Sequence, residues 1–365
     1  MPSYEDKIKE LENLISNTKY NKSTQHAIGL YKAQLAKLKE KEESRGKGKG
    51  KTEGYAVRKT GDGTVLLLGF PSVGKSTLLN AITNANSEIG AYDFTTLKCI
   101  PGLMEYKFAK IQVLDVPGVV RGAASGRGRG KEVLAVMRNA DLALVIIDAS
   151  SPGQYDTLMK EVNESGIRLN EHRPHVRITK TAKDGINIGK TCRLPMLDDE
   201  TIKTILKTFR INNANVLIRE TITDDQLIDC IEDNKKYLPA ITVLNKIDMI
   251  SKEEADKIKS KIPIDISISA KNADHLDELR ELIFEKLNFI RLYMKEPRKP
   301  ADMKEPMIMF RDSTTYDLCN KLHRDFVDKF KFVRIWGPSA KFPGQRLTTL
   351  KHAFKDKDIV ELHIR

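Results

Sequence analysis

The chain has 365 residues, enough for two or more domains with a sizeable buried core that needs no disulfide staples. Its 40% apolar and 31% charged residues exclude a wholly disordered chain, and its net charge of +12 suggests an acidic partner. The excess lies at the ends: residues 1–60 hold 14 basic and 8 acidic side chains, residues 61–296 hold 33 of each, and residues 297–365 hold 15 and 9.

Membrane and redox classes are disfavoured. No apolar run approaches the roughly 20 residues that a membrane helix requires, and the polar N-terminal sequence is unlike a secretory signal. The four cysteines are far apart and form no CxxC pair for zinc or redox chemistry: Cys99, Cys192, Cys230 and Cys319. We therefore expect a cytoplasmic protein that does not enter membranes, and we expect a monomer.

Residues 1–44 predict a helical region. Apolar side chains recur at helical spacing within residues 8–15 and again within residues 27–38. Ser3 with Asp6 resembles a capping box at the start of the first helix. Two interpretations stay open, a small helical pair packed on the body and a nucleic-acid-binding hairpin.

A basic linker is expected next. From Lys39 to Lys59 the sequence lacks apolar spacing and its later part alternates Gly with Lys, which is typical of a flexible, solvated segment. We place the linker at residues 45–62. It either only connects two domains or also contacts phosphates nonspecifically.

An α/β domain with buried parallel strands is expected in two parts, residues 63–166 and residues 237–294. Short apolar runs, rich in β-branched residues, alternate here with longer stretches of helical spacing. The strands are expected at residues 65–68, 111–114, 142–147, 241–244 and 264–268.

Two further regions differ from the α/β domain in their pattern of apolar and polar residues. Residues 167–236 are polar and contain their own short strand and helix candidates, at residues 186–188, 202–209, 216–218 and 225–231. We interpret this stretch as an inserted α+β subdomain. The tail, residues 295–365, predicts a small mixed sheet with one helix, from segments at residues 307–310, 316–327, 331–336 and 359–364.

The strongest motif is a G-x-x-x-x-G-K-S loop between an expected strand and an expected helix. Its glycines let backbone N–H groups surround a β-phosphate, Lys75 neutralises β- and γ-phosphate oxygens, and the Ser76 hydroxyl binds Mg²⁺. Lys75 is also a candidate catalytic residue. The expected nucleotide contacts of this loop are Gly69, Pro71, Ser72, Val73, Gly74, Lys75, Ser76 and Thr77.

A second motif, Asp-Val-Pro-Gly at residues 115–118, follows another expected strand. At this position Asp115 would hold Mg²⁺ through water, and the Gly118 amide would sense a γ-phosphate. Between the two motifs, where a first switch loop belongs, one threonine should complete the Mg²⁺ shell. Thr96 is the first choice and the adjacent Thr95 is the alternative.

Two further motifs predict selection of guanine. Asn245, Lys246 and Asp248 form an NKID motif, and the Asp248 carboxylate can accept hydrogen bonds from guanine N1 and N2, which adenine does not offer. Ser269, Ala270 and Lys271 follow the next expected strand, and the Ala270 amide is expected to face guanine O6. The predicted cofactors are therefore GTP or GDP with Mg²⁺.

In this order, the motifs resemble those of the developmentally regulated GTP-binding protein (DRG) family of the Obg-related GTPases. The resemblance rests on GFPSVGKST, FTTL, DVPGVVRGAASGRGRG, NKID and SAK, and it covers the whole chain. It implies a P-loop GTPase domain, an N-terminal helical region, an insertion similar to domain 2 of ribosomal protein S5, and a C-terminal TGS domain with a ubiquitin-like β-grasp fold. It also implies a translation-associated GTPase that contacts ribosomes or RNA.

The chain departs from common GTPases at Val119, where many have a water-orienting Gln. Hydrolysis is then slow or uses another group, and Arg121 is a candidate in the basic segment that ends at Lys131. That segment could instead bind a ribosomal phosphate or be a solvated switch loop. A bound K⁺ is a further possibility, against which stands Ser72, where cation-activated relatives usually have Asn.

The C-terminal tail is a further candidate for nucleic-acid binding. Its basic excess after residue 328 could dock RNA, with Trp336 and Phe342 as stacking candidates, although Trp336 also fits a core position. Three histidines, His323, His352 and His363, show no metal-ligand spacing and are interpreted as surface or packing residues.

The sequence thus predicts a Mg²⁺-dependent GTPase that hydrolyses GTP to GDP and phosphate and acts as a nucleotide-controlled switch on ribosomes or RNA. Its basic ends would make these contacts, and an accessory protein is a further possible partner. The alternative is a slow-hydrolysing, GTP-gated scaffold that acts through protein partners of the TGS domain.

Overall fold

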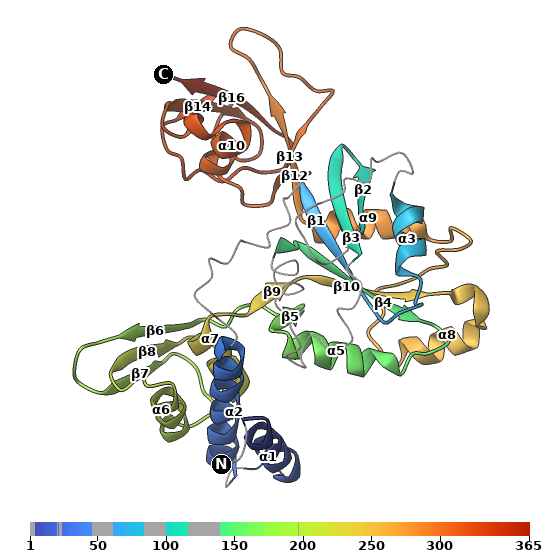
Figure 1. Cartoon of the computed structure of the whole chain (residues 1–365). Coiled ribbons are helices and arrows are strands. Elements are labelled where there is room, and N and C mark those ends of the chain that lie inside the picture. The colour runs from blue at the N-terminus through green and yellow to red at the C-terminus, as the bar shows by residue number, and fades with distance from the viewer. Residues whose placement is uncertain are drawn as a thin grey trace. The chain divides into compact units, whose positions relative to one another are not determined.

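A computed structural model describes residues 4–19, 21, 24–45, 61–83, 100–115, 139–195 and 197–365. The chain forms two compact units (Figure 1). The first unit comprises Met1–Gly54 and Gly166–Tyr237, and the second comprises Tyr55–Ser165 and Leu238–Arg365. None of the helices within the described ranges is long and apolar enough to cross a membrane.

Two N-terminal helices, α1 (Tyr4–Asn17) and α2 (Gln25–Arg45), pack against each other in the first unit. Helix α2 extends past Lys39, where the sequence suggested the start of linker-like chain. Its last residues are mainly Lys and Glu, which favour helix, and Lys39 forms a 2.9 Å ion pair with Glu12 of α1. Residues 46–60, the rest of that segment, and Ser3 of the proposed capping box lie outside the described residues.

The rest of the first unit is a three-stranded sheet with two helices. Strands β6 (Val176–Lys180) and β7 (Ile186–Lys190) flank β8 (Ala214–Ile218), with β6 antiparallel and β7 parallel to it. Helices α6 (Asp199–Thr208) and α7 (Asp224–Glu232) begin at side-chain caps on Asp198 and Thr223. One face of the sheet forms a common core with these helices, and fully buried Ala33 of α2 belongs to the same core.

Two short strands, β5 (Ile167–Leu169) and β9 (Lys236–Leu238), pair with each other where the chain enters and leaves the inserted segment. The Lys236 N–H donates a hydrogen bond to the Gly166 carbonyl at 3.0 Å. The outgoing and returning chains therefore lie side by side.

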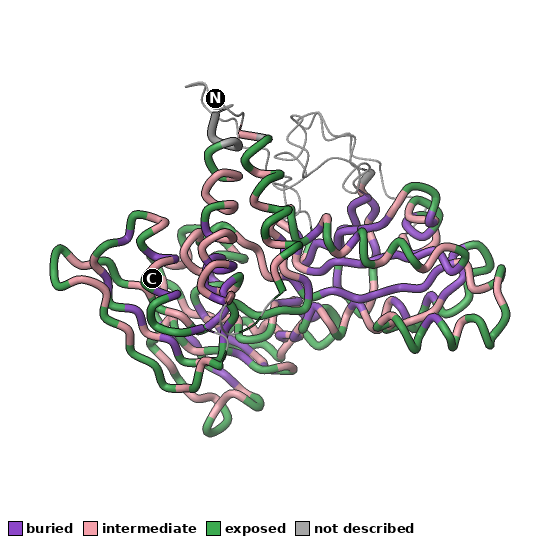
Figure 2. The backbone as a smooth tube through the Cα atoms, turned by 90° about the horizontal axis from the view of Figure 1, so that it is seen from below, coloured by how far each residue is buried: buried purple, intermediate pink, exposed green. Residues whose placement is uncertain are grey.

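A six-stranded sheet organises the second unit. Its order is β11-β10-β4-β1-β3-β2, and all neighbours are parallel except β2 and β3. Strands β1, β4 and β10 are buried along their whole length (Figure 2), as expected for parallel strands covered on both faces. The strands are β1 (Gly63–Leu68), β2 (Ile100–Tyr106), β3 (Ala109–Asp115), β4 (Leu142–Asp148), β10 (Ala240–Asn245) and β11 (Ile266–Ser267).

Helices cover both faces of this sheet. Helices α3 (Lys75–Ile82) and α9 (Leu276–Lys286) share a core with side chains from one face of the strands. Helices α5 (Gln154–Glu164) and α8 (Lys252–Lys259) lie on the other face (Figure 1), and a 3₁₀ turn, η1 (Ile247–Met249), follows β10.

The C-terminal part of the second unit has its own five-stranded sheet, ordered β13-β12-β16-β14-β15. Helix α10 (Thr315–Leu322) contributes Leu318 to the core of this sheet, and η2 (Arg324–Phe326) follows it. Its strands are β12 (Phe289–Met294), β13 (Met307–Phe310), β14 (Phe330–Trp336), β15 (Gln345–Leu347) and β16 (Asp358–Ile364). Strand β12 lies within residues 237–294, which the sequence assigned to the GTPase domain, but it pairs with β13 and β16.

Aromatic side chains join the two sheets of the second unit. The ring of Phe289 in β12 lies 5.7 Å from Phe284 of α9 and 5.1 Å from Phe310 of β13, measured between centroids. An ion pair of 2.6 Å between Lys321 of α10 and Asp62, just before β1, adds a polar contact. The C-terminal sheet is therefore packed directly on the six-stranded domain.

Candidate functional site

The candidate site lies at the carboxyl end of β1, where the sheet changes direction. Strand β1 pairs with β3 on one side and with β4 on the other, so the strand order reverses at β1. Open α/β sheets bind ligands at such a switch point. The loop of residues 69–74 connects β1 to the first turn of α3 at this position.

Two glycines of this loop are required by close approach. Gly74 has a φ of 95°, and a Cβ on it would collide with the side-chain amide of Asn245. A Cβ on Gly69 would lie 2.6 Å from the carbonyl oxygen of Ile146 in β4. The loop can therefore lie against β4 and the Asn245 side chain only because both positions lack a side chain.

Lys75 begins α3 and folds back over the loop. Its Nζ donates hydrogen bonds to the carbonyl oxygens of Gly69 at 3.0 Å and Phe70 at 2.9 Å. Burial lowers the pKa of Lys75, and the nearby charge of Asp115 opposes that shift. The Lys75 ammonium thus lies against the loop of residues 69–74.

Ser76 and Asp115 bring the first two motifs together. The Ser76 hydroxyl donates to Asp115 Oδ2 at 2.9 Å, and Asp115 is only 4% exposed. The other carboxylate oxygen, Asp115 Oδ1, is buried and has no hydrogen-bond partner within the described structure. A hydroxyl beside a buried carboxylate with an unused oxygen is a donor set that suits Mg²⁺.

Asn245, at the end of β10, connects three segments. Its Nδ2 donates to the Val73 carbonyl at 2.9 Å, and its Oδ1 accepts from the Ala270 N–H at 3.0 Å. Asn245 is 1% exposed, so these bonds satisfy an otherwise buried amide. The Ala270 N–H, expected from the sequence to face guanine O6, donates in this structure to Asn245.

Lys246 adds a second connection to the phosphate loop. It also contacts Asp148, a residue that the sequence analysis missed. Its backbone is left-handed, with a φ of 65°, and its Nζ donates to the Ser72 carbonyl at 2.8 Å and to Asp148 Oδ2 at 2.6 Å. Burial raises the pKa of Asp148, but hydrogen bonds from Lys246 and Ser150 outweigh burial and leave it below its ordinary value. Asp148 is the last residue of β4. A carboxylate at the end of an expected parallel strand is the sequence signal that could have identified it.

The Ser-Ala-Lys motif holds the Asp248 side chain of the NKID motif in place. Asp248 is exposed in η1, and the hydroxyl of fully buried Ser269 donates to its Oδ1 at 2.6 Å. Ser269 Oγ also accepts from the Asn272 N–H at 3.3 Å. Exposed Lys271 lies beside this pair in sequence, and the remaining loop positions, Pro71 and Thr77, are exposed as well.

Five residues with predicted roles in hydrolysis or metal binding lie outside the described residues: Thr95, Thr96, Gly118, Val119 and Arg121. The structure brings together the loop of residues 69–77 with Asp115, Asn245, Lys246, Asp248 and the Ser269 to Lys271 segment. No group of three or more His, Cys, Asp or Glu side chains that could hold a metal occurs in the described ranges.

The aromatic and histidine residues of the tail have mixed environments. Trp336 is half-buried, with Lys295 Nζ 4.8 Å above its ring, whereas Phe342 is 60% exposed. His352 bonds to the Ser339 hydroxyl at 3.0 Å, and the His363 ring stacks on Phe332 at 4.1 Å. These two histidines are packing residues, as the sequence predicted.

Comparison with known proteins adds family membership to this geometry. Residues 64–180 match the family model described as 50S ribosome-binding GTPase, residues 183–289 match the C-terminal region of the same domain, and residues 298–364 match the TGS domain. Developmentally-regulated GTP-binding protein 1 of Xenopus laevis is 41% identical, and protein 2 of Homo sapiens is 40% identical; each match covers 98% of both chains. The chain belongs to the developmentally regulated GTP-binding protein family.

Relatives of this DRG-family GTPase also occur in archaea. An uncharacterized GTP-binding protein of Methanocaldococcus jannaschii is 48% identical over 99% of this chain and 93% of its own. Among solved structures, a GTP binding protein from Pyrococcus horikoshii OT3 aligns with 83% of this chain and 100% of its own, at 13% identity and a TM-score of 0.41. The DRG-type chain is thus a GTP-binding GTPase with a P-loop GTPase domain and a C-terminal TGS domain.

Proposed function

We propose that this GTPase is a Mg²⁺-dependent switch that hydrolyses GTP to GDP and phosphate while associated with ribosomes. The observation that carries the nucleotide part is the Asn245 side chain, which bonds to Val73 in the phosphate loop and to Ala270 beside the base motif. One buried amide therefore fixes the distance between the two ends of a nucleotide site.

At the base end, Asp248 is the proposed guanine reader. Its exposed carboxylate can accept from both N1–H and N2–H of guanine, and the hydrogen bond from Ser269 fixes its orientation. Lys246 supports the same end because it joins Ser72 of the phosphate loop to Asp148. The Ala270 N–H, which donates to Asn245, stays the proposed contact of guanine O6.

At the phosphate end, the loop between Gly69 and Ser76 supplies backbone N–H groups and the Lys75 ammonium. Lys75 would leave the carbonyls of Gly69 and Phe70 to reach β- and γ-phosphate oxygens, and partial burial strengthens that charge interaction. Ser76, and Asp115 through water, would hold Mg²⁺, which would neutralise charge on the same oxygens. Thr96 or Thr95, Gly118 and Arg121 stay as proposed contributors to the switch and to hydrolysis.

The substitution Asp248→Asn tests the base assignment. Asn presents one acceptor and one donor, which match N1–H and the C2 carbonyl of xanthine and mismatch the two donors of guanine. We expect hydrolysis of GTP to fall at least about a hundredfold and hydrolysis of XTP to rise in the same protein preparation. Phosphate release from GTP that is unchanged would contradict the assignment. A variant that loses GTP hydrolysis without gaining XTP hydrolysis would indicate damage to the fold.

Association with ribosomes is supported by the family model and by the charge distribution. The model that matches residues 64–180 is described as a ribosome-binding GTPase, and the basic excess lies in residues 1–60 and 297–365. Phosphate contacts predict co-sedimentation with ribosomes that weakens steeply as salt rises. No co-sedimentation at low salt would instead favour a scaffold that acts through protein partners of the TGS domain.

Val119 motivates a comparison of hydrolysis rates with and without a partner, because its side chain cannot orient water. Single-turnover GTP hydrolysis should be slow for the protein alone and faster with ribosomes or an accessory protein. A rate that stays near that of GTP in buffer under every condition, K⁺ included, would leave a GTP-gated binding module. A cytoplasmic location and a monomeric state stay predictions.

A further inference from the structure

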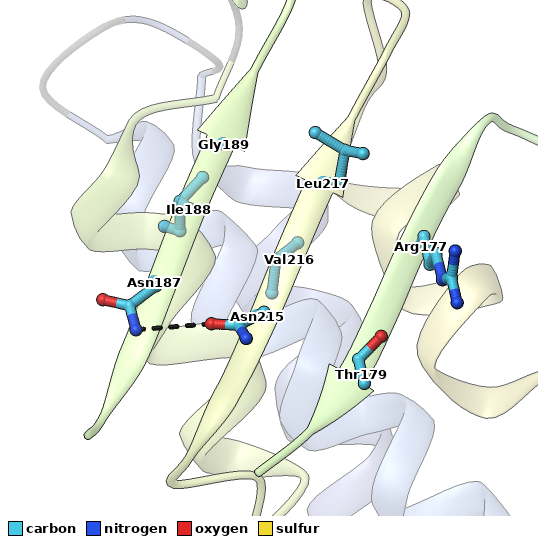
Figure 3. A pocket seen from close by; sticks show the side chains of 8 residues that line it. All are labelled: Arg177, Thr179, Asn187, Ile188, Gly189, Asn215, Val216 and Leu217. Carbon is cyan, nitrogen blue, oxygen red and sulfur yellow. Dashed lines mark hydrogen bonds between the residues drawn. The ribbon is translucent and has the colours of Figure 1, made fainter. Parts of the chain in front are cut away.

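Within the described part of the first unit, the helices cover only one face of the three-stranded sheet, and the other face is open. Its two central rows are Arg177, Leu217 and Gly189, and then Thr179, Asn215 and Asn187, each row crossing β6, β8 and β7 (Figure 3). Five of these six residues are exposed and Leu217 is half-buried. Together with Ile188 and Val216 they line a shallow hollow of about 390 Å³. We call this surface the open sheet face.

The open sheet face is distinct from the core face. Val216 is 2% exposed and belongs to the hydrophobic core shared with α6 and α7, so alternation along β8 turns Asn215 and Leu217 the other way. A Cβ placed on Gly189 would meet Leu217 Cδ1 at 3.4 Å, which puts both residues on the same side. The two faces of one sheet therefore have different chemistry, apolar inside and polar outside.

Charge on the open sheet face is positive. Pairing continues past the strand ends, where the Arg219 N–H donates to the His175 carbonyl at 3.1 Å, and alternation adds the exposed side chains of both residues to the face. None of the residues assigned to the face is acidic. Carboxylates flank it at Glu220, which bonds to His172 and to the His175 N–H, and at Asp184 in the turn before β7.

The acidic residues of this unit gather at its helices instead. The first turns of α6 and α7 carry Asp199, Glu200, Asp224 and Asp225. Helix α6 also carries lysines, and Lys32 of α2 pairs with Asp224 and Asp225, whereas the open sheet face carries arginines and no carboxylate. A face with cations and no carboxylate of its own attracts polyanions.

The uncharged residues of the face add hydrogen-bonding groups in a fixed geometry. Asn187 Nδ2 donates to Asn215 Oδ1 at 3.3 Å across the two strands (Figure 3). This bond does not use the side-chain oxygen of Asn187 or the side-chain NH₂ of Asn215, and Thr179 adds a hydroxyl. Amides and hydroxyls that both donate and accept are suited to sugar hydroxyls, and the one ring assigned to the face, His175, packs edge-on against His172.

We propose that the open sheet face binds the backbone of an RNA duplex, with Arg177 and Arg219 on phosphates and the Asn187, Asn215 and Thr179 group on 2′-hydroxyls. The proposal rests on the ribosome association proposed above and assigns it a third contact surface, separate from the basic ends of the chain. Gly189 serves it by leaving the centre of the face open to a close approach.

The test uses the full-length chain and Arg177→Glu, with Lys203→Glu as a matched control. Both residues are exposed and both changes alter the net charge equally, but Lys203 lies on α6 and not on the open sheet face. The probe is an RNA duplex of about 20 base pairs, long enough for contacts across two minor grooves. We expect Arg177→Glu to weaken binding about tenfold and to lower the salt slope by about one, and Lys203→Glu to change affinity less than about twofold.

Gly189→Glu provides a second variant that does not remove any existing side chain. Its Cβ has ordinary contact distances, so the fold should persist, while the new carboxylate fills the centre of the face. This variant should lose duplex affinity to a similar extent and retain GTP binding, which resides in the second unit. A DNA duplex of the same sequence should bind more weakly than RNA to the wild-type protein, because it lacks the 2′-hydroxyl.

The outcomes separate this proposal from the ribosomal one. Equal duplex binding by wild type, Arg177→Glu and Lys203→Glu would overturn the open sheet face as an RNA site, even if all three proteins pellet with ribosomes. Loss of ribosome binding in Arg177→Glu with duplex binding intact would assign the face to a protein partner and overturn it as well. A wild-type protein that binds the duplex through this face but not ribosomes would contradict the ribosomal function alone.

Discussion

Gly74 carries a steric requirement that links two motifs of the nucleotide site. Because Asn245 Nδ2 occupies the space of a Cβ there and the φ is 95°, Gly74→Ala must displace either the loop or the amide. We expect a loss of about 2 kcal/mol or more in the free energy of unfolding of the second unit, with GTP affinity reduced at least about tenfold. Urea unfolding and titration with a fluorescent guanine nucleotide measure the two effects.

Gly153 is the matched control for this substitution. It precedes α5 with a φ of −63° and has nothing within 4 Å of a Cβ. Gly153→Ala should therefore leave nucleotide affinity unchanged and shift stability by no more than about 1 kcal/mol. If the two alanine variants behave alike, the packing of Asn245 against Gly74 does not constrain the loop.

Asp148 gives the site a defined dependence on pH. Its folded pKa lies below the ordinary value of 3.8, so the ionised form stabilises the fold above pH 3.8, and this stabilisation is lost as pH falls through the folded pKa. Asp148→Asn should cost about 2 kcal/mol at neutral pH, because the hydrogen bond to Lys246 loses its charge. Urea unfolding of both proteins across a pH series should show this difference shrinking below pH 3.8, and a difference that is independent of pH would contradict it.

At the level of single residues, the sequence was informative where a motif has fixed spacing. The contact between Ser76 and Asp115 joins two predicted Mg²⁺ residues, and Asp248 is close to Ser269 as their motifs implied. Asp148 was missed because one carboxylate after a strand has no partner in the local sequence. Its partner, Lys246, is 98 residues away, so only the pairing of β4 with β10 brings them together.

At the scale of elements, helix α2 packs against the helices of the inserted segment. Lys32 forms ion pairs of 3.1 Å with Asp224 and 2.7 Å with Asp225, and a Cβ on Gly29 would lie 2.9 Å from Thr201 Cγ2 of α6. Burial lowers the pKa of Lys32, but the two carboxylates outweigh burial and raise it overall. The helix is thus part of the first unit and not an independent arm.

This packing predicts that Ala33→Leu destabilises the first unit. Ala33 is 0% exposed in the core shared with α6, so the larger side chain has no room and should cost about 1 to 3 kcal/mol. Gln34→Leu introduces the same side chain at the next, exposed position and should change stability by less than about 0.5 kcal/mol. Thermal unfolding followed by circular dichroism compares the two, and equal effects would show that α2 does not pack there.

Elements with strong apolar runs were predicted with nearly correct bounds, and those with weak local signals were missed. Strand β13 spans the predicted residues 307–310. Strand β2 was not expected because Pro101 and Gly102 are typical of a turn. It forms as an edge strand, where Pro is tolerated, and Gly102 lets it pack against Thr83, whose Cγ2 would lie 2.5 Å from a Cβ at that position.

The whole molecule should unfold as two units that respond differently to ligand. All described nucleotide-site residues belong to the second unit. GTP or GDP with Mg²⁺ at about 100 times its Kd stabilises the unit that binds it by about 2.7 kcal/mol. Differential scanning calorimetry should then show one transition that rises with nucleotide and one that stays in place, whereas a joint shift would contradict the division into independent units.

The pairing of β5 with β9 also has a consequence for how such a chain can be assembled during evolution. Strands β4 and β10 are hydrogen-bonded neighbours in parallel, and α5 already provides the crossover between them. The inserted segment leaves after α5 and returns beside its own exit, so it extends a finished loop without changing the sheet. This segment can therefore be gained, lost or exchanged during evolution without rebuilding the sheet. Deletion of residues 167–236 with a short bridging turn should leave a foldable GTPase core.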